Sequence, residues 1–288
     1  MIVVDCRGGL CNRMQVLASG HALARTLQRP LKVVWVLNNL LGVRYGDLFQ
    51  NPEVFGEFQV FDQLPGTGGG GGGVGRWIAA LAPDYVVDHS DPAFHAMDNK
   101  DRDELVAAQF SLETLKAHQT IYVRSYDLFF KVPKPFEPFV PVRELQERIG
   151  TVTGRFGKTP GVHVRRGTGH DPHPGALKYS PTEAFIDRMR QLLDRGEAET
   201  FYLATDDPDE ADRLRTTFPG RVHFDPKSGF DHTSIPAMHD AVVDLYCLAG
   251  TDRILGSVGS TFSKTASTIG NIPLERIRRE PQSQVPPR

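Results

Sequence analysis

The sequence predicts an α/β protein made of two doubly wound, Rossmann-like domains facing a central cleft. Three observations carry this prediction. Short β-branched runs alternate with amphipathic helical segments, glycine turns follow several of these runs, and a proline-rich segment divides the alternation into two halves. At roughly 150 residues per domain, 288 residues accommodate two such domains.

The first 36 residues read as strand, glycine turn, helix and strand. Ile2–Val4 is a β-branched run that stops at the pair Gly8-Gly9, and apolar residues then recur at helical spacing over residues 12–27. The next apolar run is 31–36, so the chain opens with a parallel βαβ unit. Residues 121–125 form another predicted strand.

Residues 66–75 read GTGGGGGGVG and predict a surface loop with no means of packing. The phosphate-loop alternative lacks a preceding strand and a following Gly-Lys-Ser or Gly-Lys-Thr. Four prolines in residues 132–141 predict a stiff, extended linker. We therefore place the domain boundary within 131–142, giving domains of 1–135 and 136–288.

The second half alternates helices and strands from end to end. The predicted helices are 142–149, 181–195, 208–218, 237–249 and 262–269, and the predicted strands are 161–165, 200–204, 221–224 and 253–256. This pattern is typical of a doubly wound sheet, in which ligands bind near the carboxyl ends of the strands.

Composition excludes several function classes. A net charge of −2 argues against a protein that coats nucleic acid, and no run approaches the roughly 20 apolar residues of a membrane span. The N-terminus lacks the basic region of a signal peptide. Three cysteines, Cys6, Cys11 and Cys247, favour neither a disulfide framework nor a zinc site, so we expect a reduced, cytoplasmic setting.

The first segment of chemical interest is the turn after the opening strand. It contains Gly8, Gly9, Cys11, Asn12 and Arg13. Two glycines let backbone approach a ligand closely, and the following helix N-terminus favours an anion. The alternative is a tight turn in which Asn12 caps the helix.

The second segment is the strand with His163 and Arg165 on one face and Arg166 on the other. Two polar side chains on a β-branched strand need a partner, and a phosphate suits both because arginine offers a planar fork and histidine an N–H donor. The alternative for Arg165 is an ion pair with a carboxylate inside the protein.

The third segment contains two acids at a strand end. Asp207 has a structural explanation, because Asp207-Pro-Asp-Glu210 reads as a capping box at a helix start. Asp206 is therefore the functional candidate, and its carboxylate suits the N–H groups of a guanine base. The fourth segment, Gly256–Ser263, is a turn rich in glycine and hydroxyl groups that could cradle an anion or merely cap the helix through Ser260 or Thr261.

Two other polar groups have weaker interpretations. Asp240 and Asp244 lie four residues apart on one helix face, and we expect solvated charges there, with bracing of Arg165 as the alternative. His170, Asp171 and His173 form a polar loop without an evident further ligand, so we predict a flexible loop near the cleft and no metal site.

These four segments, in this order and spacing, resemble the fucosyltransferase superfamily, which includes bacterial nodulation-factor, core N-glycan and protein O-fucosyltransferases. The glycine turn resembles its N-terminal motif, and 163–167 resembles its HxRRxD-type motif. Residues 201–208 resemble the second motif, and 240–248 with 254–263 the third. The resemblance covers most of 1–270, and 37–120 matches weakly.

The resemblance implies a GT-B fold and metal-independent, inverting transfer of a sugar, with GDP-fucose as the expected donor and no cofactor. By carry-over, Arg165 and His163 hold the β-phosphate and Asp206 binds guanine. Ser260, Thr261 and Phe262 line the nucleotide pocket, and backbone amides around Gly9–Asn12 reach the pyrophosphate. Arg165 would stabilise the charge left on the β-phosphate as the sugar leaves.

One position departs from the family pattern. Where the family often has Asp after the RRG segment, this chain has Thr168, and Asp171 is the candidate general base. A dissociative mechanism without a protein base is the alternative.

Competing hypotheses keep the fold and change the function. They are transfer from another nucleotide sugar, and a catalytically silent protein that binds a nucleotide sugar. A dinucleotide-dependent enzyme is disfavoured because no strand leads into GxGxxG. The acceptor, whether glycan, peptide or small molecule, is not indicated by the sequence.

Overall fold

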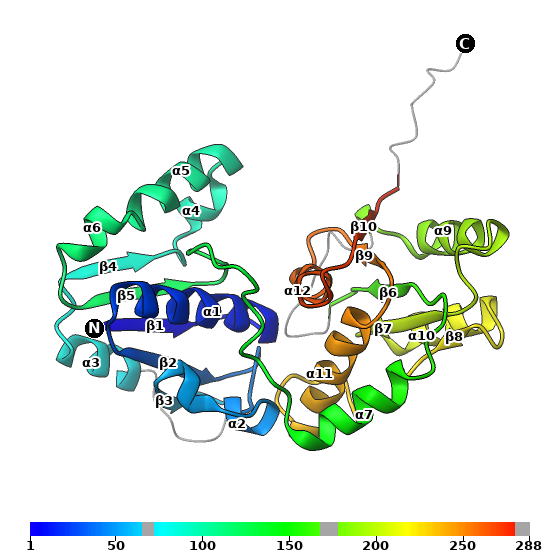
Figure 1. The fold of residues 1–288 in the computed structure, drawn as a ribbon, viewed down its shortest axis with the longest axis horizontal. Coiled ribbons are helices and arrows are strands. Elements are labelled where there is room, and N and C mark those ends of the chain that lie inside the picture. Colours follow the sequence, from blue (N-terminus) through cyan, green and yellow to red (C-terminus); the bar gives the residue numbers. More distant parts are fainter. Residues whose placement is uncertain (65–71, 168–177, 280–288) are drawn as a thin grey trace, which may run out of the picture. The chain divides into compact units, whose positions relative to one another are not determined.

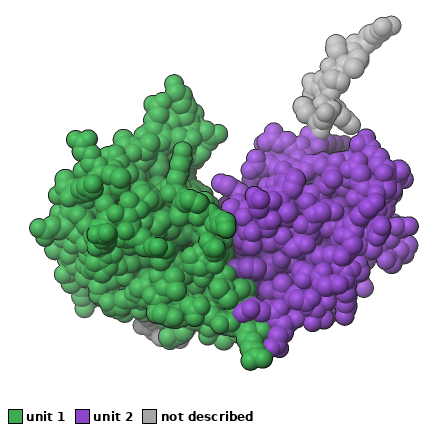
Figure 2. Space-filling model, viewed as in Figure 1, with its two compact units in different colours: residues 1–143, 232–238 green, residues 144–231, 239–288 purple. Residues whose placement is uncertain are grey.

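The computed structural model describes residues 1–64, 72–167 and 178–279, which form two compact units. Unit 1 comprises residues 1–143 and 232–238, and unit 2 comprises 144–231 and 239–288 (Figure 2). Each unit is built around one five-stranded parallel sheet with helices between the strands (Figure 1). The α/β class and the two Rossmann-like halves predicted from the sequence are confirmed.

Unit 1 has the strand order β3-β2-β1-β5-β4, with every neighbouring pair parallel. Its strands are β1 (Ile2–Cys6), β2 (Leu31–Leu37), β3 (Glu57–Asp62), β4 (Tyr85–Asp88) and β5 (Ile121–Ser125). Its helices are α1 (Leu10–Leu27), α2 (Tyr45–Leu48), the 3-10 turn η1 (Pro52–Phe55), α3 (Gly72–Ala80), α4 (Pro92–Ala96), α5 (Asn99–Gln109) and α6 (Leu112–Lys116).

Unit 2 has the strand order β10-β9-β6-β7-β8, again parallel throughout. Its strands are β6 (Gly161–Val164), β7 (Phe201–Thr205), β8 (Val222–His223), β9 (Ile254–Ser257) and β10 (Leu274–Ile277). Its helices are α7 (Arg143–Thr153), α9 (Thr182–Asp194), α10 (Pro208–Thr217), α11 (Ile235–Ala249) and α12 (Thr261–Gly270). Helix α11 starts in the part of the chain that belongs to unit 1.

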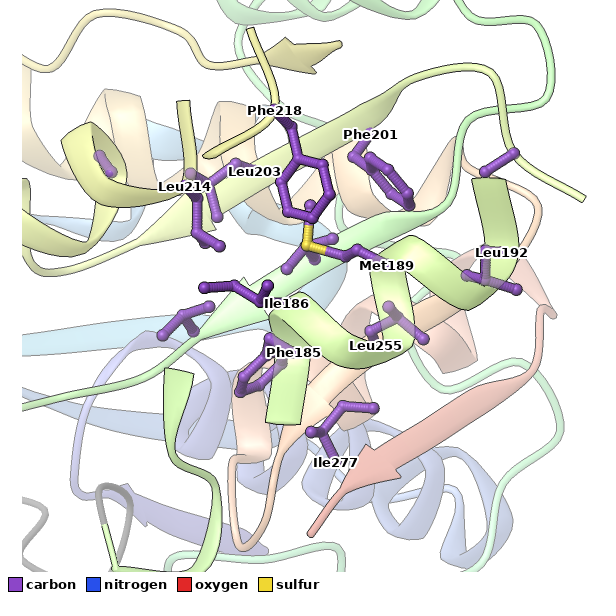
Figure 3. Packing of buried hydrophobic residues seen from close by; sticks show 14 residues of the cluster. Phe185, Ile186, Met189, Leu192, Phe201, Leu203, Leu214, Phe218, Leu255 and Ile277 are labelled. Carbon is purple, nitrogen blue, oxygen red and sulfur yellow. The ribbon is translucent and has the colours of Figure 1, made fainter. Parts of the chain in front are cut away.

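The unit 2 core lies between its sheet and helices α9 and α10. Phe185 and Met189 of α9 are fully buried and pack with Leu203 of β7 and Leu255 of β9 (Figure 3). Alternate strand residues therefore point to this core. The residues between them, including His163 and Tyr202, point to the opposite face of the sheet.

The loop prediction over 66–75 is wrong for its last residues, because α3 begins at Gly72. Val74 is buried in a cluster with Val3, Val34 and Tyr122, so this one apolar residue anchors the glycine-rich end of the helix. The remainder of the tract, residues 66–71, lies outside the described residues.

Candidate active site

The site candidates of unit 2 gather where the strand order of its sheet reverses. The chain runs from β6 to β7 and β8 on one side, then crosses to β9 and β10 on the other. In doubly wound sheets, ligands bind outside the carboxyl ends of the strands at such a reversal. The loops that begin at Arg165, after β6, and at Val258, after β9, both start at this edge.

Arg165 is the first residue beyond β6, and its side chain is largely buried with 15% exposure. Its Nη1 forms an ion pair with Oδ2 of Asp206, the first residue beyond β7. The alternative stated for Arg165, an ion pair inside the protein, is therefore present, and its partner is Asp206.

Asp206 holds the backbone of the β6 loop as well. Its Oδ1 accepts a hydrogen bond from Arg166 N, and its Oδ2 accepts one from Gly167 N, both at 2.8 Å. Gly167 has a φ of +88°, a left-handed conformation that favours glycine. Asp206 thus uses both carboxylate oxygens to hold residues 165–167, and base recognition by Asp206 stays a prediction.

The Arg166 side chain forms a second set of buried polar contacts, which the sequence did not indicate. It is 7% exposed and donates from Nε to Oε1 of Glu210 at 2.8 Å and from Nη2 to Oγ1 of Thr182 at 2.8 Å. Its Nη1 donates to the carbonyl oxygens of Arg165 and Ser180 at 3.1 and 3.2 Å. Arg166 therefore joins the loop after β6 to the starts of α9 and α10.

Ser180 ties the same loop to the far side of the site. Its hydroxyl accepts a hydrogen bond from Val258 N at 2.9 Å and donates to the carbonyl of Ile277 at 2.7 Å. Ser180 is fully buried. Since its carbonyl also accepts from Arg166, one serine links the β6 loop, the β9 loop and strand β10.

His163 lies on the face of β6 opposite the core and is buried. Its ring stacks on Phe262 with centroids 4.9 Å apart, and its Nδ1 is 3.4 Å from Oγ of Ser260. Burial lowers the pKa of His163 to about 4, opposed by the charge of Asp206. The imidazole is therefore neutral near pH 7, and any hydrogen bond that it donates comes from one N–H.

The turn after β9 brings the hydroxyl groups predicted from the sequence to this edge. Ser260 is the N-cap of α12 and accepts from Ser263 N at 3.4 Å, while Thr261 and Phe262 form its first turn and are half-buried. Gly256 is required for packing, since a Cβ there would lie 2.7 Å from Ser263 Oγ. The capping alternative is thus realised, and it uses the same residues as the anion cradle.

The capping box predicted at residues 207–210 is half correct. Asp207 is the N-cap of α10 and accepts from the amides of Asp209 and Glu210 at 2.9 and 3.1 Å. The Glu210 carboxylate does not complete the box. It is committed to Arg166 and to the hydroxyl of Thr182, at 2.6 and 2.8 Å from its two oxygens.

The expectation of solvated charges at Asp240 and Asp244 is wrong, because both are buried. Asp244 accepts from Tyr202 at 2.7 Å and pairs with Lys227 at 2.5 Å; burial raises its pKa despite that lysine. Asp240 pairs with Arg148 at 2.6 Å. These acids bind the loop after β8 and helix α7, and neither pairing involves Arg165.

The glycine turn of unit 1 begins helix α1 at Leu10, with Gly9 as N-cap. The Asn12 capping alternative is therefore wrong; its Nδ2 donates instead to the carbonyl of Tyr126 at 2.9 Å. Gly8 has a φ of +78°, and a Cβ there would meet Asn12 at 3.0 Å. Backbone geometry at Gly8 thus permits the close packing of this turn.

Arg13 does not lie at a surface that a ligand could reach. It is fully buried, donates to the carbonyls of Gly8 and Val36 at 2.9 and 2.7 Å, and lies over the Trp35 ring at 5.0 Å. Burial lowers its pKa to about 10. Arg13 therefore stabilises the turn at Gly8-Gly9 through its hydrogen bond to the Gly8 carbonyl.

All three cysteines are buried, and none of them forms a disulfide bond. Burial raises the pKa of the Cys6 thiol far above its usual range and that of Cys247 to about 12, so neither is a thiolate near pH 7. Cys11 lies in the first turn of α1 beside Asn12.

The structure brings His163, Arg165, Asp206, Ser260, Thr261 and Phe262 to one edge of the unit 2 sheet, and it places Gly8, Gly9, Cys11, Asn12 and Arg13 in unit 1. Asp171 lies outside the described residues, as do His170 and His173. Within residues 1–64, 72–167 and 178–279, no three metal-ligating side chains form a metal-binding cluster, and no helix is long and apolar enough to cross a bilayer.

Comparison with known proteins identifies the fold. No family model matches the chain, and no curated protein sequence matches it. The solved structure of NodZ alpha-1,6-fucosyltransferase with GDP matches with a TM-score of 0.58 and 18% identity, over 92% of this chain and 91% of that chain.

Two further fucosyltransferases match over nearly the whole of this chain. POFUT1 in complex with GDP has a TM-score of 0.53 and 12% identity, covering 96% of this chain and 98% of that chain. A variant of Arabidopsis thaliana FUT1 with GDP has a TM-score of 0.58 and 13% identity, covering 99% of this chain and 71% of that chain. The chain therefore has the GT-B fold of these fucosyltransferases, as the resemblance implied.

Proposed function

We propose that this protein transfers a sugar, fucose, from a GDP-sugar to a hydroxyl acceptor, with inversion at the anomeric carbon and without a metal ion. One observation carries the proposal: Arg165, held by Asp206, lies at the strand-order reversal of a sheet whose fold is shared with GDP-bound fucosyltransferases. A nucleoside diphosphate presents its anionic group to that edge in folds of this class.

Arg165 supplies the positive charge in this proposal. When the bond between the sugar and the β-phosphate breaks, negative charge grows on the phosphate oxygens, and an arginine fixed beforehand stabilises it without rearrangement. Asp206 fixes Arg165, and neutral His163 donates one N–H. Ser260, Thr261 and Phe262 line the nucleotide site; Gly8, Gly9, Cys11 and Asn12 stay predictions for donor contacts.

The acceptor hydroxyl attacks the anomeric carbon from the side opposite the leaving diphosphate, which gives inversion. Asp171 is the candidate base that takes the hydroxyl proton. In a dissociative reaction the bond to the leaving group breaks first and a protein base contributes little. Asp171→Asn separates the two routes, because it lowers transfer only if the carboxylate takes the proton.

GDP release from GDP-fucose, with and without a panel of glycan, peptide and small-molecule acceptors, tests the proposal. Wild-type protein should release GDP in the presence of a chelator, and Arg165→Ala should lower the rate by about 100- to 1,000-fold. Arg188→Ala is the control, because Arg188 pairs with Glu275 on α9 and β10. GDP-fucose binding without any turnover would instead favour the catalytically silent binding protein.

A further inference from the structure

We infer that Glu210 is a positioning residue of the donor site, acting through Arg166 on Arg165. The inference rests on the proposed function, since it assigns a task to the surroundings of the proposed catalytic arginine. Glu210 lies in the first turn of α10 and is 8% exposed. A glutamate at this helical position ordinarily reaches back to the N-cap, but Asp207 caps α10 here by itself.

The Glu210 carboxylate is instead part of a closed, buried arrangement. It accepts from Nε of Arg166 and from the hydroxyl of Thr182, whose oxygen in turn accepts from Nη2 of Arg166. Each of the three side chains therefore bonds both others. A buried guanidinium needs such a counter-charge, because an unpaired charge in the interior is strongly unfavourable.

This arrangement controls the backbone that carries Arg165. Nη1 of Arg166 donates to the carbonyl of Arg165, while the amide of Arg165 donates to Ser257 Oγ at 3.0 Å. The next two amides, of Arg166 and Gly167, are held by Asp206. The amide and carbonyl of Arg165 and the amides of Arg166 and Gly167 thus each have a fixed partner. The Arg165 carbonyl is held by the Arg166 side chain, whose charge Glu210 neutralises.

Loss of the Glu210 charge would change that geometry for an electrostatic reason. Arg166 would retain its charge and would be attracted to another carboxylate. Asp206 is the nearby candidate, because it already accepts hydrogen bonds from the backbone amides of Arg166 and Gly167. A shift of the Arg166 guanidinium toward Asp206 would compete with Arg165 for the same oxygens. Arg165 would then lose its fixed position, which costs more in the transition state than in donor binding.

A more exposed ion pair elsewhere in unit 2, Arg188–Glu275, provides a control for the loss of one carboxylate charge, and the measured Tm reports the stability of each variant. Arg188 of α9 donates from Nε and Nη2 to Glu275 of β10 at 2.6 and 2.9 Å. This pair also joins two elements of the unit through a carboxylate and a guanidinium. Glu275→Gln therefore removes the same charge as Glu210→Gln without touching the loop at 165–167.

The experiment measures kcat and KM for GDP release from GDP-fucose, GDP affinity and Tm for wild type, Glu210→Gln, Thr182→Val and Glu275→Gln, at least about 15 °C below the lowest Tm. We expect Glu210→Gln to lower kcat by about 10- to 100-fold while KM and GDP affinity change less than about threefold. Thr182→Val should lower kcat by about three- to tenfold. Glu275→Gln should leave kcat within about twofold of wild type.

Each outcome decides the inference. A kcat within about twofold of wild type in both Glu210→Gln and Thr182→Val overturns it and leaves the proposed function intact, as does an equal fall in Glu275→Gln. If Glu210→Gln does not fold, Thr182→Val decides alone, because it removes one hydroxyl and keeps both charges. Absence of any GDP-fucose turnover in wild type overturns the proposed function, and this inference with it.

Discussion

Replacing Asp206 by asparagine removes one negative charge and converts an acceptor oxygen into an N–H donor, while side-chain size is unchanged. The carboxylate accepts three hydrogen bonds, from Arg166 N at Oδ1 and from Gly167 N and Arg165 at Oδ2. An asparagine that keeps its oxygen toward Arg166 N turns its amino group toward two donors. In Asp206→Asn, the new amino group therefore faces the N–H donors of Gly167 and Arg165 in a largely buried site.

The expected cost follows from those contacts. A charge-assisted hydrogen bond contributes about 1.5–3 kcal/mol, and an unsatisfied buried N–H costs about 1–3 kcal/mol. Both Asp206 and Arg165 side chains are 15% exposed, so water recovers part of this loss. We expect a destabilisation of about 2–4 kcal/mol, which lowers Tm by about 5–15 °C for a domain of this size.

Thermal denaturation and titration calorimetry together test this reasoning. The neighbouring Asp207→Asn is the control, because asparagine caps a helix as well as aspartate does, and its Tm should stay near that of wild type. Asp206→Asn should weaken binding of GDP and of inosine diphosphate, which lacks the exocyclic amine, by a similar factor on the order of tenfold. An unchanged Tm with loss of the preference for GDP over inosine diphosphate would refute the loop-holding role and establish Asp206 as the base reader.

Three further predictions concern stability and use urea denaturation. Because burial depresses the folded pKa of His163 to about 4, stability should fall by up to about 3 kcal/mol as pH drops from about 6.5 to 4; an equally steep loss in His163→Gln would contradict this. Gly8→Ala should cost about 1–2 kcal/mol, since φ is +78° and the new Cβ crowds Asn12; a neutral result would refute the strained turn. Asp244→Asn should cost about 3–5 kcal/mol by leaving Lys227 buried without its carboxylate, and a loss below about 1 kcal/mol would show that water reaches the lysine.

The central strands were predictable because they are buried on both faces and read as continuous apolar runs. β1, β2 and β5 follow this rule in unit 1. The strands that escaped prediction, β3, β4 and β10, lie at sheet edges, where half-exposed side chains interrupt the pattern. Helix α3 was missed in part because its first residues are glycines, which carry no helical signal.

Contacts within the candidate site were predictable where the residues directly follow neighbouring strands, and less so where the contact partners come from distant segments of the chain. The order of the strands brings Arg165 and Asp206 to one edge, which the alternation of elements already indicated. The ion pair between Arg166 and Glu210 joins residues 44 positions apart in the sequence, and no local sequence pattern predicts it. The one available signal was the redundancy of two acids, Asp207 and Glu210, at a helix start that needs a single cap.

The burial of Asp240 and Asp244 was missed for a related reason. Spacing on a helix identifies a shared face but not what covers it, and here Lys227 and Ser228 come from the loop after β8. A carboxylate four residues from another on an otherwise apolar helix is thus compatible with either solvent or a buried pair.

Nucleotide binding tests the central claim most directly. Calorimetric titration of the wild-type protein with GDP, UDP and dTDP should give binding of GDP at least about tenfold tighter than of the other two, and Arg165→Ala should weaken the GDP affinity by about 10- to 100-fold. Tight binding of UDP or dTDP without binding of GDP would contradict the account, as would GDP affinity unchanged by the loss of Arg165.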